Sequence, residues 1–306
     1  MAIGEIAVRT QQKVQWQRYY ELTKPKVVAL ILFTALVGML LSSPGAIPWQ
    51  NMVFGLLGIG LGAAAGAVIN HVVDQRIDAV MERTSKRPIP SGRMDTPHAL
   101  IFALLLTLAS MIMLASLVNL LTAVLTFIAL IGYAVIYTVF LKRSTPQNIV
   151  WGGLAGAAPP LLGWTAVTGE IHQDAMLLLL LIFVWTPPHF WSLAIRRRDD
   201  YARAGLPMLP VTHGIAFTKL QILLYTVMLL AVSLLPFITR MSGLIYLSGA
   251  VALGAGFIYH AVVLYRGKGD EHAMRTFGYS IFYLSLLFGF LLLDHYARIV
   301  IRALIG

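Results

Sequence analysis

The sequence contains no cysteine, and this absence excludes two kinds of stabilising or functional site. Without thiols the chain has no disulfide framework and no thiolate metal site. Charged residues are also scarce, at 12% of the 306 residues, whereas 58% are hydrophobic. A water-soluble domain of this length normally carries far more charge, so lipid is the expected solvent for most of the chain.

An apolar leader is missing from the first 23 residues. Residues 1–23 have no hydrophobic core and no cleavage signal, so neither a secretory signal nor a long transit peptide is expected there. A bacterial plasma (inner) membrane is the simplest location for such a chain.

Apolar runs of about 20 residues, long enough to cross roughly 30 Å of hydrocarbon, alternate with short charged islands. In lipid the backbone must satisfy its own hydrogen bonds, so each run is expected to be a helix. These observations predict an all-α integral membrane protein with a single domain, residues 1–306. Nine spans are expected, at residues 27–41, 52–73, 99–118, 120–141, 149–167, 175–195, 220–238, 244–265 and 277–293.

Lys and Arg are distributed unequally between the two sides of this arrangement. With a cytosolic N-terminus, 20 of the 23 basic residues fall on the cytosolic side, and only Arg240, Arg298 and Arg302 fall on the other. Cytoplasmic loops of membrane proteins are enriched in basic residues, so the N-terminus is expected in the cytosol and the C-terminus on the opposite side. The net charge of +10 mostly reflects this bias, and no nucleic-acid partner is expected.

Asn70, Asp74 and Asp78 are spaced four residues apart where the second predicted span reaches the cytosol. On a helix this spacing gives one slowly turning face, with about 6 Å of rise per step. Two carboxylates and an amide oxygen suit Mg²⁺, which usually keeps waters and bridges to substrate phosphates. Three basic residues that could bind phosphate follow: Arg83, Lys86 and Arg87. The alternative is a solvated loop in which acids and bases form weak exposed pairs.

Small residues mark two of the predicted spans. Gly58, Gly62 and Gly66 continue the four-residue spacing upstream of Asn70 and predict the close approach of a neighbouring helix. The fifth span is rich in Gly and Pro and poor in bulk. It indicates either close helix packing or room for a large flat or long ligand.

A second long charged island follows the sixth span, and Asp199 and Asp200 could supply another acidic wall facing the first. The span itself contains Pro187 and Pro188, which free backbone carbonyls and imply a neighbouring cavity. His189 follows them inside the apolar run. Ionisable residues within spans are functional candidates, although a hydrogen bond from His189 to a kinked backbone is an equal alternative.

Several motifs together resemble the UbiA superfamily of intramembrane prenyltransferases, and within it the branch that acts on haem. The resemblance covers nearly the whole chain and rests on Leu22-Thr23-Lys24-Pro25-Lys26, on Asn70, Asp74 and Asp78 with Met81, Arg83-Thr84 and Arg87-Pro88, on the Gly-Gly and Pro-Pro pairs of the fifth span, on Pro188-His189-Phe190, and on Asp200-Tyr201 with Ala204-Gly205 and Pro207-Met208-Leu209-Pro210. Many relatives carry a second D-x-x-x-D motif, but here Arg203 and Ala204 stand where its last acid would be.

The resemblance implies a nine-helix UbiA-type bundle whose active site faces the cytosol. It implies transfer of a farnesyl group from farnesyl diphosphate to a vinyl group of haem b, with addition of water, to form haem O. The expected cofactor is Mg²⁺. The expected partners are the lipid bilayer and either haem A synthase or the assembly of a terminal oxidase.

The same resemblance assigns roles to individual residues. The expected catalytic residues are Asp74, Asp78, Arg83, Arg87 and Asp200. The expected metal ligands are Asn70, Asp74, Asp78, Asp199 and Asp200. The expected substrate-binding residues are Lys26, Lys86, Tyr137, Lys142, Arg143, Asn148, His189, Arg198 and Tyr201.

Two other functions remain open at this point. A prenyltransferase of the same fold could act on an aromatic quinone precursor, and its extracted product would differ in absorbance from a haem. A membrane transporter with broken helices is the second alternative. The crowding of ionisable residues at one face and the apolar centres of most spans disfavour a transporter.

Overall fold

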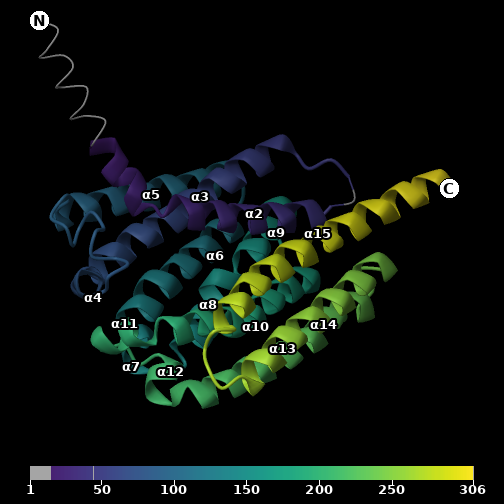
Figure 1. The fold of residues 1–306 in the computed structure, drawn as a ribbon. Coiled ribbons are helices and arrows are strands. Elements are labelled where there is room, and N and C mark those ends of the chain that lie inside the picture. Colours follow the sequence, from purple (N-terminus) through teal and green to yellow (C-terminus); the bar gives the residue numbers. More distant parts are fainter. Residues whose placement is uncertain (1–14, 44, 306) are drawn as a thin grey trace, which may run out of the picture.

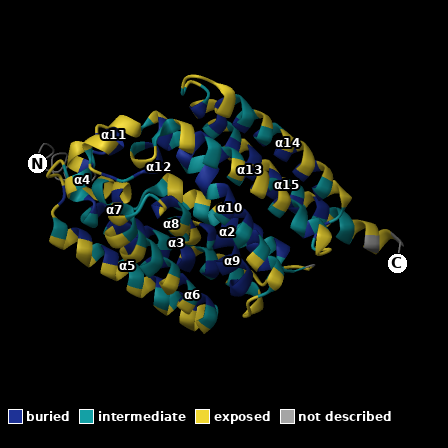
Figure 2. Ribbon diagram, turned by 90° about the horizontal axis from the view of Figure 1, so that it is seen from below, coloured by how far each residue is buried: buried dark blue, intermediate teal, exposed yellow. Residues whose placement is uncertain are grey.

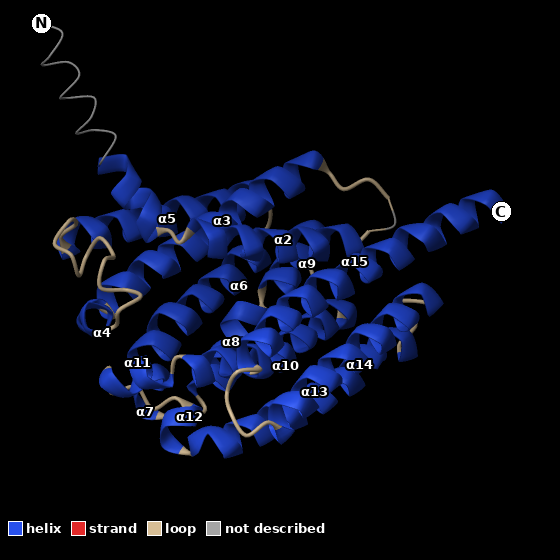
Figure 3. Cartoon of the chain, in the orientation of Figure 1, coloured by secondary structure: helices blue, strands red, loops and turns tan. Residues whose placement is uncertain are grey.

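The structure, a computed structural model, describes residues 15–43 and 45–305, which form helices joined by short loops (Figures 1 and 3). Most of the N-terminal segment analysed above, residues 1–14, lies outside the described residues. No β-strand occurs in the described part of the chain. The all-α class expected from the sequence is confirmed.

The long helices are α2 (Pro25–Leu41), α3 (Trp49–Val73), α5 (Thr96–Leu117), α6 (Leu120–Ile131), α10 (Gln173–Arg196), α13 (Gly214–Ile238), α14 (Leu244–Arg266) and α15 (Ala273–Ile305). The shorter helices are α4 (Gln75–Val80), α7 (Lys142–Ser144), α8 (Asn148–Ala157), α9 (Pro159–Thr168), α11 (Arg198–Arg203) and α12 (Leu209–Thr212). A π-helix, η1 (Gly132–Leu141), continues α6 into α7.

Seven helices in the described residues are long and apolar enough to cross a membrane: Trp49–Val73, Thr96–Leu117, Leu120–Ser144, Gln173–Arg196, Gly214–Ile238, Leu244–Arg266 and Ala273–Ile301. An eighth span results if helix Gln15–Leu22 and α2, which meet at a bend of 48°, are counted together. The chain is therefore a multi-pass membrane protein, and the number nine stays a prediction.

The fifth predicted span, residues 149–167, differs from a single helix. It is divided into α8 and α9, which meet at Ala158. Pro159 and Pro160 begin α9, because proline is tolerated in the first turn of a helix but cannot donate the hydrogen bonds that would continue the preceding one.

The outer faces of the helices carry large apolar side chains that need lipid around them (Figure 2). On α5 and α6, for example, Ile112 and Leu120 are 66% and 69% exposed. The interior is packed with fully buried side chains such as Leu178, Phe257 and Tyr283. A soluble protein of this size would not expose so many large apolar residues.

The glycine stripe of α3 permits close packing, as the sequence predicts, but against three different partners. A Cβ atom added at Gly58 would lie 2.5 Å from the Leu114 side chain, and one at Gly62 would lie 2.8 Å from Thr126. At Gly66 the nearest side chain is Tyr133, at 3.3 Å. The partner changes along the helix because residues spaced by four drift around its axis.

The short helices α4, α7, α11 and α12 gather at one end of the bundle, whereas the C-terminal end of α15 lies at the other (Figures 1 and 2). Both long charged islands of the sequence are therefore brought to the same end. Most of the predicted site residues belong to these islands and therefore lie at this end.

Candidate active site

The three predicted metal ligands lie where α3 passes into α4. α3 ends at Val73, and Asp74 is the capping residue between the two helices, with φ −85° and ψ 1°. The N–H of Asp78 still donates to the Asp74 carbonyl at 2.8 Å, so the one-turn spacing is kept across the interruption. All three side chains, including Asn70, are buried.

Asp74 is the centre of a hydrogen-bonded cluster. Its Oδ2 atom accepts from the Lys142 ammonium at 2.6 Å and from the Asn70 amide at 2.8 Å. The Asn70 Oδ1 atom in turn accepts from the Lys24 ammonium. A buried carboxylate requires such compensation, because desolvating an unpaired charge is very costly.

Asp78 is held by a basic residue of the same island. Its Oδ2 atom pairs with Arg87 Nη1 at 2.6 Å, and the Thr84 hydroxyl donates to its backbone carbonyl at 3.1 Å. Arg143, predicted to bind substrate, donates to the carbonyl of Val73 at 3.0 Å beside the cluster. The acids and bases are thus paired, as in the alternative drawn from the sequence, but the carboxylates are buried rather than solvated.

The π-helix η1 supplies another wall of this cluster. The Asn70 amide donates to the Thr138 hydroxyl at 3.2 Å, and Lys24 lies 3.4 Å from the Tyr133 hydroxyl. The rings of Tyr133 and Tyr137 stack with centroids 5.9 Å apart. Widened π turns often occur at functional sites, and this one places Thr138 against Asn70 and Tyr133 against Lys24.

The side chains present fit a divalent cation that is shared with a substrate. Asp74 Oδ1 is buried and has no hydrogen-bond partner in the described part of the chain. The ammonium groups of Lys142 and Lys24 already lie against oxygens of the predicted ligand set. Within residues 15–43 and 45–305 no group of three or more His, Cys, Asp or Glu could hold a metal. Mg²⁺ commonly binds through one or two carboxylates plus substrate phosphates, so a smaller set is sufficient.

The second island has a different geometry. Asp200 is buried and pairs with Arg203 and Arg197 of its own segment, whereas Asp199 and Arg198 are exposed. Asp200 is therefore paired with two arginines, and it does not belong to a group of oxygen-bearing side chains like the one around Asp74.

Tyr201 links the two islands. Burial raises the pKa of Tyr201, against the opposing effects of the positive charges of Arg83 and Arg197. Tyr201 also packs in one buried cluster with Met81, which follows α4. One apolar cluster therefore extends from the loop after the first acidic motif to α11.

Other predicted site residues vary in their surroundings. Lys26, Arg83 and Lys86 are exposed. Asn148 is fully buried: its amide donates to the Thr145 carbonyl at 2.8 Å, while its Oδ1 atom has no hydrogen-bond partner among the described residues. Buried unpaired oxygens of this kind need an explanation, and a bound substrate is one.

The small residues of α8 and α9 are explained largely by close packing. A Cβ added at Gly152 would lie 2.2 Å from the Tyr137 ring, and one at Gly153 would lie 3.0 Å from Thr186. At Gly163 it would lie 1.9 Å from the carbonyl oxygen of Ala35. Gly156 alone of these four faces open space.

His189 lies among aromatic rings at the interface of α10 and α15. Its ring stacks on Trp185 at 4.1 Å and on Phe277 at 4.6 Å. Its Nδ1 atom is 2.7 Å from the hydroxyl of Ser280. The backbone-bonded alternative drawn from the sequence is therefore not realised, because the partner is a side chain of another helix.

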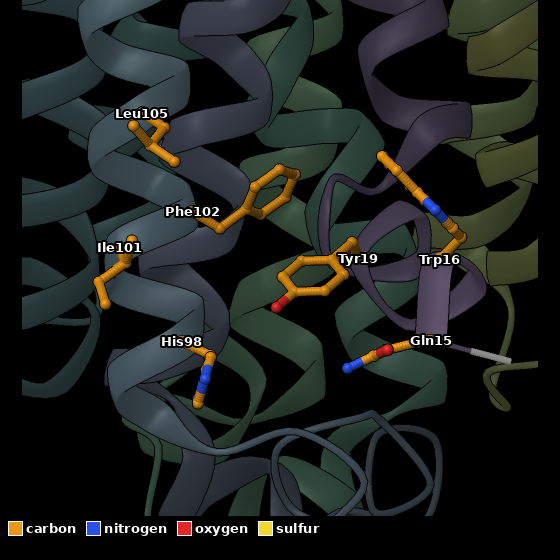
Figure 4. Close-up of a pocket in the computed structure, with 7 residues that line it drawn as sticks. All are labelled: Gln15, Trp16, Tyr19, His98, Ile101, Phe102 and Leu105. Carbon is orange, nitrogen blue, oxygen red and sulfur yellow. The ribbon is translucent and has the colours of Figure 1, made fainter. Parts of the chain in front are cut away.

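A groove lies apart from these residues, between helix Gln15–Leu22 and the start of α5 (Figure 4). Its volume is about 520 Å³. The ring of Tyr19 faces that of Phe102, with centroids 4.9 Å apart. The lining residues are Gln15, Trp16, Tyr19, His98, Ile101, Phe102 and Leu105, and none of them is a predicted site residue.

Sequence reasoning missed Lys24 as a member of the cluster and chose Lys26 instead. Lys24 contacts Asn70 and Tyr133 from a left-handed backbone conformation, with φ 51°. The available signal was its place directly before Pro25 and the first apolar run, where a charged side chain needs a partner.

Sequence similarity assigns the chain to a protein family. The profile of the UbiA prenyltransferase family matches residues 31–287, and the chain belongs to this family. A curated relative from Thioalkalivibrio sulfidiphilus, named Protoheme IX farnesyltransferase, is 68% identical over 300 residues, which cover 98% of this chain and 99% of the relative.

Solved structures show the same fold at low identity. A digeranylgeranylglyceryl phosphate synthase matches with a TM-score of 0.79 and 20% identity, over 92% of this chain and 99% of the other. A UbiA homologue from Archaeoglobus fulgidus, bound to DMAPP and Mg²⁺, matches with a TM-score of 0.61 and 16% identity, over 90% and 99%. The UbiA-type bundle expected from the sequence is confirmed at the level of fold.

Proposed function

We propose that this chain transfers a farnesyl group from farnesyl diphosphate to a vinyl group of haem b, forming haem O at the cluster around Asp74. The name and the 68% identity of the relative support the substrate pair. The observation that carries the proposal is the buried Asp74 carboxylate. One of its oxygens has no partner in the described part of the chain, and it is flanked by the amide of Asn70 and the ammonium of Lys142.

The cluster suits the departure of a diphosphate. Asn70, Asp74 and Asp78 would hold Mg²⁺, which would neutralise the negative charge that develops on the leaving diphosphate. Lys142 and Arg87 already pair with Asp74 and Asp78, and Lys24 donates to the amide oxygen of Asn70. With Mg²⁺ held by the carboxylates, the nitrogens of the three basic side chains would be free to donate to diphosphate oxygens, and such charge-assisted hydrogen bonds are strong.

The remainder of the reaction needs exclusion of water. When the allylic C–O bond breaks, its electron pair leaves with the diphosphate, and the vinyl carbon of haem attacks the allylic carbon. A water molecule then adds to the resulting cation and loses a proton. An apolar interior prevents water from capturing the allylic cation first. The stacked rings of Tyr133 and Tyr137 lie beside the charged cluster, with the Tyr133 hydroxyl 3.4 Å from Lys24.

The placement in the cell follows from the charge bias. We propose one membrane-embedded domain with nine helices in the bacterial inner membrane, N-terminus and active site in the cytosol. Mg²⁺ is the proposed cofactor, and haem A synthase or the assembly of a terminal oxidase is the proposed protein partner. The farnesyl chain, being apolar, would reach the site sideways from lipid.

Asp74→Ala is the decisive variant for this proposal. Purified protein receives haem b, farnesyl diphosphate and Mg²⁺, and the haem product is measured by mass spectrometry. We expect wild-type protein to form hydroxyethylfarnesyl haem and Asp74→Ala to form none, while the variant still extracts from membranes as a folded protein. Full turnover by Asp74→Ala would refute the metal site, and a prenylated quinone precursor in place of haem O would refute the substrate.

A further inference from the structure

The hydrogen bonds of Ser280 determine which nitrogen of His189 carries the proton. The Ser280 hydroxyl lies 2.6 Å from the carbonyl oxygen of Phe277, which can only accept. A hydroxyl has one proton, so Ser280 donates it to that carbonyl. The hydroxyl oxygen must then accept from His189 Nδ1, which lies 2.7 Å away. His189 is consequently protonated at Nδ1, and Nε2 carries the lone pair.

This arrangement is rigid. The Trp185 indole donates to the backbone carbonyl of Ser280 at 2.8 Å, while its ring stacks on the imidazole. Phe277 stacks on the same imidazole and supplies the carbonyl that orients Ser280. The ring of His189 therefore cannot turn without disturbing contacts of both α10 and α15.

The Nε2 atom has no hydrogen-bond partner among residues 15–43 and 45–305, and no acid pairs with the ring there. His189 is half-buried, and Nε2 is not one of the described side-chain atoms that are both fully buried and without a partner. The lone pair is therefore open to a ligand. A neutral imidazole whose N–H is anchored by a second residue is the usual form of a metal-ligating histidine. Histidine is also the proximal ligand of haem iron in globins and peroxidases.

We infer that His189 Nε2 ligates the iron of haem b while the haem is bound as substrate, and that Ser280 is the residue that positions it. The inference rests on the proposed function, since it presumes a haem substrate. Binding forms one coordinate Fe–N bond from the free lone pair, and neither proton nor electron transfer is needed. The bond would fix the porphyrin, and with it the reacting vinyl group.

The test is a spectroscopic titration of purified full-length protein with ferric haem b. Wild-type protein should give the absorption bands of imidazole-ligated haem, and His189→Gln should lose them. Ser280→Ala should bind haem about 10-fold or more weakly, the effect typical of removing an anchoring partner of a metal-ligating histidine. His98→Gln is the matched control, because His98 lies in the groove of Figure 4, and its spectrum and affinity should equal those of wild type.

A second measurement determines the protonation of His189 directly and does not depend on whether Ser280→Ala folds. Nitrogen NMR of ¹⁵N-histidine-labelled wild-type protein without haem should show His189 protonated at Nδ1 only, with its signal identified by its loss in His189→Gln. A proton on Nε2 would overturn the inference, as would an unchanged haem spectrum in His189→Gln. Wild-type affinity and spectrum in Ser280→Ala would overturn the role of Ser280.

Product formation is scored separately and reports on the proposed function. Wild-type protein that ligates haem through His189 but forms no farnesylated haem would refute the proposed function and leave the ligation intact. Protein that forms the product without a His189-dependent spectrum would refute the ligation and leave the proposed function intact.

Discussion

Lys24 illustrates how a single residue is held by the whole site. It is one of two described non-glycine residues with positive φ, and the proline that follows it disfavours the right-handed helical region. A conformation of this kind costs on the order of 1–3 kcal/mol and persists where the surroundings enforce it. Here the ammonium of Lys24 reaches the Asn70 side chain, so the strained turn places a positive charge against one of the predicted metal ligands.

Replacing Lys24 by Gln should therefore lower the rate of prenyl transfer without removing the protein from the membrane. Removing one preorganised donor to a developing negative charge typically costs about 100-fold in kcat, and we expect a loss of that order. The measurement is product formation at saturating farnesyl diphosphate. Lys268→Gln, an exposed lysine of the loop before α15, is the control and should retain full activity.

The sequence predicted that Asn70, Asp74 and Asp78 lie one helical turn apart, and this spacing survives the passage from α3 to α4. It could not predict which bases reach them. Lys24 and Lys142 are 46 and 68 residues from their partners, and such pairings depend on how helices pack. Asp199 was predicted to be a metal ligand. Its side chain is exposed, and the role stays a prediction.

At the scale of elements, α2 and α9 are joined by two reciprocal close contacts. A Cβ at Gly38 would lie 2.1 Å from the carbonyl oxygen of Pro160, and one at Gly163 would lie 1.9 Å from that of Ala35. Backbone cannot move aside as a flexible side chain can. Small residues thus allow α9, the second half of the divided span, to lie directly on α2.

Gly163→Ala should destabilise the protein by about 1–3 kcal/mol, the usual cost of overpacking. A thermal unfolding assay in detergent should show a lower midpoint. Gly156→Ala in α8 is the matched control, because a Cβ there meets no atom of residues 15–43 or 45–305 within 4 Å. Equal midpoints for the two variants would contradict the close contact.

The start of α14 depends on a carboxylate from α15. Asp294 is 1% exposed, accepts from the N–H groups of Gly243 at 2.6 Å and Tyr246 at 3.3 Å, and pairs with Arg298 Nε at 3.0 Å. A carboxylate at a helix N-terminus satisfies free N–H groups and complements the helix dipole.

Asp294→Ala should consequently lower the unfolding midpoint more than any exposed acid does. Removing one partner of a buried ion pair costs about 3–5 kcal/mol, and two backbone donors lose their acceptor as well. Glu170→Ala, at an exposed acid, should leave the midpoint unchanged. A midpoint for Asp294→Ala within error of Glu170→Ala would show that the cap is dispensable.

The elements themselves were largely predictable, because long apolar runs have only one stable form in lipid. Asn119 even caps α6 by accepting from the N–H of Thr122 at 2.8 Å, which explains how two spans follow each other with almost no turn. The division at Ala158 was not predicted, although the two prolines that cause it are visible in the sequence. The π-helix leaves no composition signal, since it is a matter of hydrogen-bond register.

At the scale of the whole molecule, the basic residues are predicted to lie mainly on the cytosolic side of the membrane. Because the chain has no cysteine, single introduced cysteines can test this orientation. Glu170→Cys and Lys268→Cys each introduce one thiol at an exposed position in loops predicted to lie on opposite sides. In intact bacterial cells a membrane-impermeant maleimide should label Glu170→Cys only, and Lys268→Cys should react after lysis. The reverse pattern would invert the proposed orientation.

The pairing of each acid with an internal base has a consequence for the order of binding in the proposed reaction. A bare metal ion would have to expel Lys142 and Arg87 into a buried site with no anion to receive them. A metal that arrives together with diphosphate offers the acids a new cation and the bases a new anion at once. The resting protein should therefore take up metal and diphosphate cooperatively, each raising the affinity for the other by the same factor.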